Sequence, residues 1–389
     1  MLKGLGLLTQ RKVQEMKKLI LASAVSALFA APATVLAQAK PAPVPTLDKI
    51  LETSGISVSG YIDAGYTHSD RNQPGFTTTR VFDQQNNSFG LNQFGLTVAK
   101  QPKEGFGGLV NLTVGRDAQF IHSFPEAAPG SMFDVTQAFL QYAGGPLTVI
   151  AGKFTTLHGT EVIASTGNTN ISRSILFGSV PFTHTGVRAT WALSDTVSLI
   201  AGVNNGWDQM TDSNKGKTAE LGATLNPIKP LTITISGYSG KETVPQSTPG
   251  SPEGTRTSLN AVASYTIIDP LSVGLEVLAV SQDNVGGSKA KYNGVAGYVT
   301  YMFTPKLRGV LRAESFDDKN GFHFAPAAFP TSDTKYKEVT LTGAFLASDS
   351  FEARVEGRRD QATNKVFTDY AGATSKTMTS IALQGLYKF

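Results

Sequence analysis

The 389-residue sequence contains no cysteine, and after residue 37 it has no apolar run long enough to form a membrane-spanning helix. The lack of cysteine excludes a disulfide scaffold and thiolate metal sites, and it is compatible with an oxidising compartment outside the cytoplasm. The length alone allows two ordinary domains or one large β structure. The absences therefore point away from small disulfide-rich folds and helical membrane proteins.

The first 37 residues have the pattern of a signal peptide. From Met16 onward, a basic start leads into a short apolar stretch and then small residues, with Val35 and Ala37 at the −3 and −1 positions of a cleavage site. We predict that residues 1–37 are cleaved, with the true start at Met1 or Met16. The alternative, a retained anchor helix, is disfavoured because the apolar core is too short to span a bilayer.

The net charge of +4 comes from this leader. Residues 1–37 hold five of the 34 basic residues and one of the 30 acidic residues, so the rest of the chain has 29 of each and is neutral. The basic pI therefore gives no argument for a nucleic-acid partner. Residues 38–56 follow as a Pro-rich periplasmic linker, with the pattern of a single helical turn at 47–52.

From residue 57 to residue 389 the sequence alternates apolar and polar residues with period two, which predicts β-strands. We count about sixteen such segments of ten residues or slightly more, the length that a tilted strand needs to cross a bilayer. In the segment 351–358, for example, Glu352, Arg354, Glu356 and Arg358 all share one face. The ambiguous segments leave a range of 14 to 18 strands.

The connections between these segments alternate between short and long. Seven are tight and eight are long and polar, the long ones at roughly 70–87, 118–132, 157–181, 206–217, 241–256, 282–291, 316–334 and 360–374. An up-and-down barrel with one end in the periplasm and the other outside the cell has this pattern. We therefore predict an all-β, antiparallel, transmembrane barrel with short periplasmic turns and long external loops.

Aromatic residues gather where the predicted strands meet the short turns, as in the interfacial girdle of a membrane barrel. Ordinary β-propensity of aromatic residues is the alternative explanation. The chain ends in an alternating strand, 381–389, in which Tyr387 and Phe389 keep the apolar phase. A lipid-exposed sheet edge is not tolerated, so this strand must close the barrel against the first. The ending is typical of the C-terminal insertion signal of bacterial outer-membrane barrels.

Several stretches carry a family resemblance: GKFTTLHGTEVIASTGNTNISRSILFGSVPFTHTGVRATW at 152–191, VNNGWD at 203–208, SGYIDAGY at 59–66, NSFGLNQ at 87–93 and VTQAFLQY at 135–142. With them the chain resembles the family of outer-membrane β-barrel porins grouped as OmpL-like. The resemblance implies a channel in the outer membrane of a Gram-negative bacterium, without an established substrate. The acidic loop motif of trimeric general porins is not visible, which argues against a trimer and against the constriction of a general porin. Both oligomeric states, a monomer or a trimer, stay open.

The third long connection is the candidate for the pore constriction, because in sixteen-stranded porins this loop folds into the lumen. It carries Glu161, Asn168, Asn170 and Arg173, whose charges and amides would screen solutes. A surface loop with a few polar groups is the alternative. The charged residues expected to line the lumen are Arg188, Glu276, Arg308, Arg312, Glu314, Glu338, Glu352, Arg354, Glu356 and Arg358. Because these charges nearly balance, we expect weak ion selectivity.

No motif indicates an enzyme, a cofactor or a metal site. His158 and His184 flank the third loop, with Ser165, Ser172 and Ser174 nearby, which leaves a barrel-embedded hydrolase as a minor alternative. A structural or adhesive barrel with a plugged lumen is the other. We predict a porin for passive diffusion of small polar solutes or ions. Its expected partners are outer-membrane lipid, lipopolysaccharide, periplasmic chaperones and the barrel-insertion machinery.

Overall fold

The computed structural model describes residues 46–71, 79–125, 130–244 and 251–389. The predicted leader and most of the linker before residue 46 lie outside these residues. A short helix, α2 (Leu47–Ser54), begins at the position where the sequence indicated a helical turn and runs two residues beyond it. No helix in the described ranges is both long and apolar enough to cross a bilayer.

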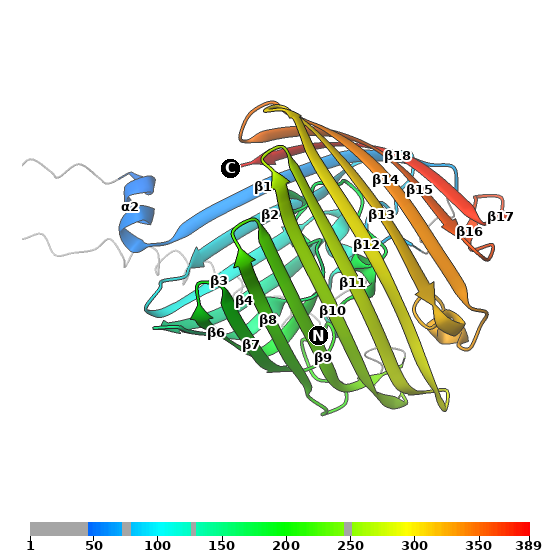
Figure 1. The fold of residues 1–389 in the computed structure, drawn as a ribbon, viewed down its shortest axis with the longest axis horizontal. Coiled ribbons are helices and arrows are strands. Elements are labelled where there is room, and N and C mark those ends of the chain that lie inside the picture. Colours follow the sequence, from blue (N-terminus) through cyan, green and yellow to red (C-terminus); the bar gives the residue numbers. More distant parts are fainter. Residues whose placement is uncertain (1–45, 72–78, 126–129, 245–250) are drawn as a thin grey trace, which may run out of the picture. The chain divides into compact units, whose positions relative to one another are not determined.

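Sixteen strands of the described residues form one closed antiparallel barrel, in which each strand pairs with its neighbours along the chain and β1 pairs with β18 (Figure 1). The barrel strands are β1 (Ser57–Ser69), β2 (Ser88–Lys100), β3 (Gly105–Val114), β4 (Phe133–Gly144), β5 (Leu147–Thr155), β6 (Thr183–Ser194), β7 (Val197–Asn204), β8 (Thr218–Ile228), β9 (Leu231–Thr243), β10 (Glu253–Ile268), β11 (Leu271–Val285), β12 (Ser288–Thr304), β13 (Leu307–Asp318), β14 (Thr334–Leu346), β15 (Phe351–Ala362) and β18 (Thr377–Lys388). The prediction of an up-and-down barrel of about sixteen strands is confirmed.

Short elements occupy the long connections. They are the 3₁₀ helices η1 (Arg116–Phe120), η2 (Ser165–Gly167), η3 (Phe177–Ser179), η4 (Lys319–Gly321) and η5 (Pro326–Ala328), and a small hairpin of β16 (Phe367–Thr368) and β17 (Thr374–Ser375).

The two faces of the strands differ in the way that the alternation predicted. In β15 the residues Glu352, Arg354, Glu356 and Arg358 are buried, while Phe351 and Val355, in the alternate phase, are exposed. The exposed apolar face points outward, where hydrocarbon surrounds a membrane barrel, and the polar face points into the lumen. Aromatic residues at the short-turn end lie on the outward face and are exposed: Phe106, Tyr142, Trp191, Tyr265, Tyr301, Phe303, Phe345, Phe351, Tyr387 and Phe389.

One predicted loop is wrong. The sequence indicated a long external loop at 282–291, but β11 and β12 are joined by a two-residue turn of Gly286 and Gly287, with φ of 54° and 79°. Two glycines accept positive φ at both central positions, which is the requirement of the tightest hairpin turns. The polar residues that looked like a loop therefore belong to the strands.

The C-terminal residue closes the barrel. The N–H of Phe389 donates to the carbonyl of Gly60 at 2.9 Å, and the N–H of Gly60 donates to the carbonyl of Phe389 at 2.9 Å. The Phe389 ring lies against Gly60, where a Cβ would come within 2.5 Å of the ring. Gly60 thus makes room for the last side chain at the seam between β1 and β18.

Candidate functional site: a lumen narrowed by the third loop

The third loop, residues 156–182 between β5 and β6, lies inside the barrel. Its residues bond to inward side chains of strands around the circumference, among them Asp63 of β1, Tyr238 of β9, Glu276 of β11 and Glu356 of β15. A segment can contact all of these strands of a closed barrel only from within. The loop therefore crosses the lumen and narrows it.

Carboxylates of the barrel wall hold the backbone of this loop. Glu314 of β13 accepts hydrogen bonds from the N–H of Ile175 at 2.7 Å and the N–H of Leu176 at 3.2 Å. Glu356 of β15 accepts from the N–H of Ile171 at 2.6 Å and the N–H of Ser172 at 2.9 Å. Each of the two side chains accepts from two consecutive backbone N–H groups, so each fixes one turn of the loop.

The middle of the loop is tied to the wall beside the seam of the barrel, at β1 and β2. Ser165 donates its hydroxyl to Asp63 at 2.5 Å, and its N–H donates to the side-chain oxygen of Gln93 of β2 at 3.1 Å. Asp63 is also the acceptor for the side-chain amide of Gln384 on β18 at 2.8 Å, which joins the loop to the seam. On the opposite side of the barrel, the hydroxyl of Tyr238 of β9 accepts from the N–H of Leu157 at 2.8 Å, so these anchors together give the loop one defined path across the lumen.

The four residues predicted for the constriction all lie in this loop and are buried there. Arg173 donates to the carbonyls of Val162, Ile163 and Ile171, so its guanidinium shapes the loop backbone. Asn168 bonds to the backbone of Val162 and Ala164 in the same turn. Asn170 donates to Thr342 of β14 at 2.7 Å. Glu161 accepts from the N–H of Ser174 and from Arg312. Their contacts are thus with the loop and the wall.

The ten strand charges predicted for the lumen all lie on the face opposite to the exposed apolar residues, and nine of them are classed as buried, with Arg308 partly exposed. They pair extensively. Arg312 bonds to Glu161 at 2.7 Å and Glu338 at 3.1 Å, and Arg354 bonds to Glu352 at 2.6 Å, which also pairs with Arg308. The wall at β13 to β15 is therefore a network of opposite charges beneath the third loop.

Several residues of this network were not found by sequence reasoning. Arg80, in the first long connection, turns inward and pairs with Asp360 of β15 at 3.2 Å. Glu220 of β8 is the partner of Arg188. No sequence pattern indicated Arg80, because it lies in a polar connection without a period. The alternation in β8 did place Glu220 on the inward face, so that residue could have been predicted.

The two histidines beside the third loop do come together, with the Tyr238 ring between them. The ring centroids of His158 and His184 lie 4.6 Å and 4.4 Å from that of Tyr238. His158 bonds to the hydroxyls of Ser236 and Ser258 rather than to the serines of its own loop. Within the described residues no carboxylate bonds to His158, so the acid–base–nucleophile arrangement of a hydrolase is not assembled there.

Near the external mouth, a cavity of about 160 Å³ lies beside the end of the third loop. Trp207, Tyr292 and Phe322 contribute to its lining. Asp208 at its edge accepts hydrogen bonds from the N–H groups of Phe182 and Thr183, and burial raises the pKa of Asp208 to about 6. Burial also lowers the pKa of His323, another lining residue, to about 3, so this histidine is neutral at physiological pH. The described residues offer no cluster of three metal-ligating side chains.

On the periplasmic side of the loop, the inward residues of β5 to β9 carry hydroxyl groups. Thr148, Thr190, Ser198, Thr224 and Thr234 are only partly buried and lie in phase with the inward face. Thr148 pairs with Thr190 in register, and Thr224 pairs with both Ser198 and Thr234. We call this set the hydroxyl band.

A closed sixteen-stranded barrel with an apolar outer wall, a polar interior and a loop folded across the lumen defines a porin of the outer membrane. The family comparison agrees: residues 55–389 match the model described as "putative beta-barrel porin-2, OmpL-like". The chain belongs to this family, as its motifs predicted, and it is an integral outer-membrane channel protein. The comparison with curated proteins gave no match.

Solved structures of outer-membrane channels share the fold at low sequence identity. The chain is similar to the channel DcaP of Acinetobacter baumannii, with 15% identity and a TM-score of 0.58 over 86% of this chain and 97% of that one. It is also similar to an anion-selective porin from Comamonas acidovorans, with 11% identity and a TM-score of 0.59 over 86% and 99% of the two chains. The trimer form of OmpT of Vibrio cholerae matches with 12% identity and a TM-score of 0.58, over 86% and 99%.

Proposed function

We propose that the channel passes small uncharged and weakly charged hydrophilic solutes by passive diffusion, with little preference for ion sign. The observation that carries this proposal is that charged side chains of the lumen already have partners in the third loop or the wall. Glu314 and Glu356 are engaged by the third loop, and Arg312, Arg354 and Arg188 are paired with carboxylates. The partly exposed hydroxyl band remains for contact with solutes, and hydroxyls can both donate and accept hydrogen bonds.

Glu161, Asn168, Asn170 and Arg173 would act in this channel by fixing the shape of the constriction. Their polar atoms bond to the loop and the wall, so removal of Arg173 or Glu161 would loosen the loop rather than remove a charge from the solute path. We expect Arg173→Ala and Glu161→Ala to change the size and noise of single-channel steps in a planar bilayer. Current steps with the same size and noise in the wild type and both variants would disprove the assignment of the constriction.

The reversal potential in a salt gradient tests the selectivity. We expect a value near zero for the wild type, since paired charges of both signs leave a weak net field. Thr224→Lys adds an unpaired cation to the hydroxyl band and should shift the potential toward anion selectivity. Thr224→Gln adds similar bulk without charge and serves as the matched control. A strongly selective wild type would refute the proposal while leaving the channel itself intact.

A plugged structural barrel is the second candidate, and the span of the third loop across the lumen favours it. The two are separated by conductance: folded, inserted protein that gives no steps would be a plugged barrel. No catalytic role is proposed, because His158 lacks a carboxylate partner among the described residues. A porin built for diffusion needs neither a cofactor nor a metal ion.

Export and assembly complete the proposal. Residues 1–37 would be removed as a signal peptide, and 38–56 would remain as a periplasmic linker ahead of the barrel at 57–389. Periplasmic chaperones would deliver the chain, and the insertion machinery would recognise Tyr387 and Phe389. Lipid and lipopolysaccharide would surround the outer wall of the barrel. The chain would act as a monomer or a trimer, and the solved OmpT trimer form makes a trimer a reasonable expectation. Native mass spectrometry of the purified protein measures the oligomer directly.

A further inference from the structure

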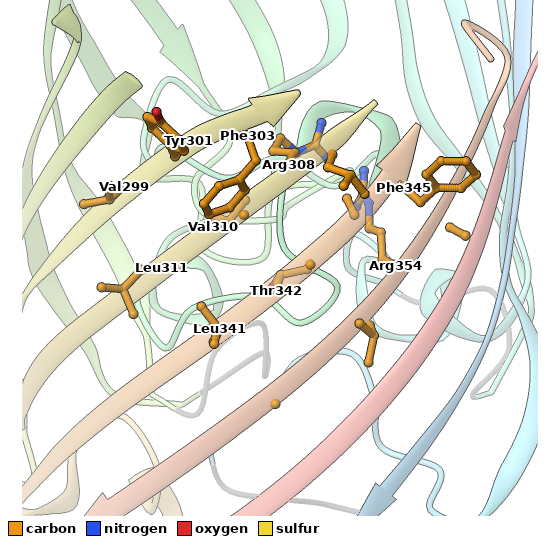
Figure 2. A pocket seen from close by; sticks show the side chains of 17 residues that line it. Val299, Tyr301, Phe303, Arg308, Val310, Leu311, Leu341, Thr342, Phe345 and Arg354 are labelled. Carbon is orange, nitrogen blue, oxygen red and sulfur yellow. The ribbon is translucent and has the colours of Figure 1, made fainter. Parts of the chain in front are cut away.

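The outer wall of the barrel carries a hollow of about 980 Å³ on strands β12 to β15. Figure 2 shows Tyr301, Phe303 and Phe345 near one end of these strands, with Val299, Leu311 and Leu341 further along them. Two other hollows of the outer wall, on β2 to β5 and on β8 to β10, have about half this volume, 460 Å³ and 490 Å³. We call the larger hollow the wall groove.

The wall groove exists because glycines, which have no side chain, form its floor. A Cβ placed on Gly357 of β15 would meet no atom within 4 Å, and one on Gly343 of β14 would meet only a methyl group of Val355 at 3.6 Å. Gly343 pairs directly with Gly309 of β13, so two adjacent strands lack an outward side chain at this level. The neighbouring apolar side chains stand above this floor and form the walls.

The wall groove opens toward the periplasmic rim of the barrel. Phe303 and Leu307, which line it, flank the short turn that contains Lys306. Lys306 is exposed and forms no ion pair with any carboxylate of the described residues. A molecule that fits must therefore combine a long apolar part, for the groove, with an anionic group at the rim.

A phospholipid of the periplasmic leaflet has this combination. The groove faces the hydrocarbon of that leaflet, which must fill any hollow in the wall, and a phosphate at the headgroup level would lie at the depth of Lys306. Within a bilayer the acyl chain gains no hydrophobic transfer energy, so its binding rests on van der Waals contact along the groove and on the charge pair at the rim. Aromatic side chains at the rim suit the same boundary region.

We propose that the wall groove binds one acyl chain of a periplasmic-leaflet phospholipid, with the lipid phosphate paired to Lys306. Bound lipid would cover the glycine floor of the groove and support the register of β13 to β15, behind which the third loop is anchored. The site is separate from the solute path, so the proposal does not depend on what the channel conducts.

Native mass spectrometry of the full-length protein, delipidated and then incubated with phosphatidylglycerol, tests the proposal. We expect the wild type to bind one lipid and Gly357→Leu to lose at least tenfold in occupancy, because the leucine side chain would occupy the groove from a position whose Cβ meets no atom within 4 Å. Ala201→Leu, an exposed outward position on β7, is the matched control and should bind as the wild type does. Lys306→Gln should weaken binding of phosphatidylglycerol while leaving the groove intact.

Equal lipid occupancy in the wild type and Gly357→Leu would overturn the proposal. An oligomer that the wild type forms and Gly357→Leu loses, without a change in lipid, would assign the groove to a second copy of the chain instead. Single-channel conductance of Gly357→Leu, expected to match the wild type, confirms that this variant is folded and inserted. If the channel proposal fails, the wild type gives no conductance steps. If only the lipid proposal fails, the conductance is normal and the lipid occupancy is equal in the wild type and Gly357→Leu.

Discussion

Replacement of Glu314 by alanine removes the carboxylate that holds one turn of the third loop. The N–H groups of Ile175 and Leu176 then lose their acceptor, and both residues are almost completely buried. A buried donor left without an acceptor costs about 1–3 kcal/mol, so the loss for the two N–H groups is about 2–6 kcal/mol. At 1.4 kcal/mol per factor of ten, the closed state of this turn is disfavoured by about 30-fold to 10⁴-fold.

The barrel should survive this substitution. Arg312, the cation beside Glu314, keeps Glu161 and Glu338 as partners, so no buried charge is left alone. The anchors at Asp63 and Glu356 also remain, which confines the loosening to the turn near Ile175.

Hydrogen exchange of the amides at 175 and 176 is the direct assay, and noise in the open-channel current is the functional one. We expect exchange to rise by at least about 30-fold and current fluctuations to increase, while the far-ultraviolet circular dichroism of the barrel stays unchanged. Glu314→Gln should lie between the wild type and Glu314→Ala, because one acceptor oxygen remains. Glu253→Ala, an exposed carboxylate at the start of β10, is the control. Unchanged protection in Glu314→Ala would refute the view that wall carboxylates hold the loop.

Other substitutions test other parts of the molecule. The pKa of Asp208 is raised to about 6 in the folded chain, against about 4 in the unfolded chain, so Asp208 adds stability at low pH that is lost as the pH rises through 6. Asp208→Asn should therefore raise the melting temperature at pH 7.5 and leave it nearly unchanged at pH 4. An equal gain at both pH values would contradict this linkage. Phe389→Ala should reduce the folded barrel in outer membranes, seen as the heat-modifiable band on gels, whereas Phe303→Ala, another exposed aromatic residue, should not. Arg188→Met leaves buried Glu220 unpaired and should cost about 3–5 kcal/mol in unfolding free energy; adding Glu220→Gln should recover much of it, and no recovery would show that the pair is not the cause.

The barrel could be predicted because period-two alternation encodes it residue by residue. The predicted loops 241–256 and 282–291 place the next strands at 257 and 292, four residues after the observed starts of β10 and β12 at Glu253 and Ser288. These deviations, and the loop wrongly predicted at 282–291, have one cause. Outside the bilayer the outward face of a strand meets water and turns polar, so alternation fades while the hydrogen-bonded ladder continues.

The interior of the lumen could be predicted only in part. Alternation gave the phase of each charged strand residue, and Glu276 and Arg312 are buried on the inward face. It did not give their partners, because Glu276 bonds to the loop amide of Thr160, 116 residues away along the chain. Such a contact depends on the path of an irregular segment, for which the sequence has no period to read. Arg80 was missed for the same reason.

The loop contacts alter what the charge pattern means for transport. From the sequence, equal numbers of Arg and Glu on the inward face suggest a transverse field acting on solutes. In the folded chain, Glu276, Glu314 and Glu356 accept hydrogen bonds from loop amides, and these amides take up acceptor sites that would otherwise face water or solutes. The charges that look like a selectivity filter are thus part of the support of the constriction. Neutralising any of them should therefore alter the stability of the open channel more strongly than its preference between cations and anions.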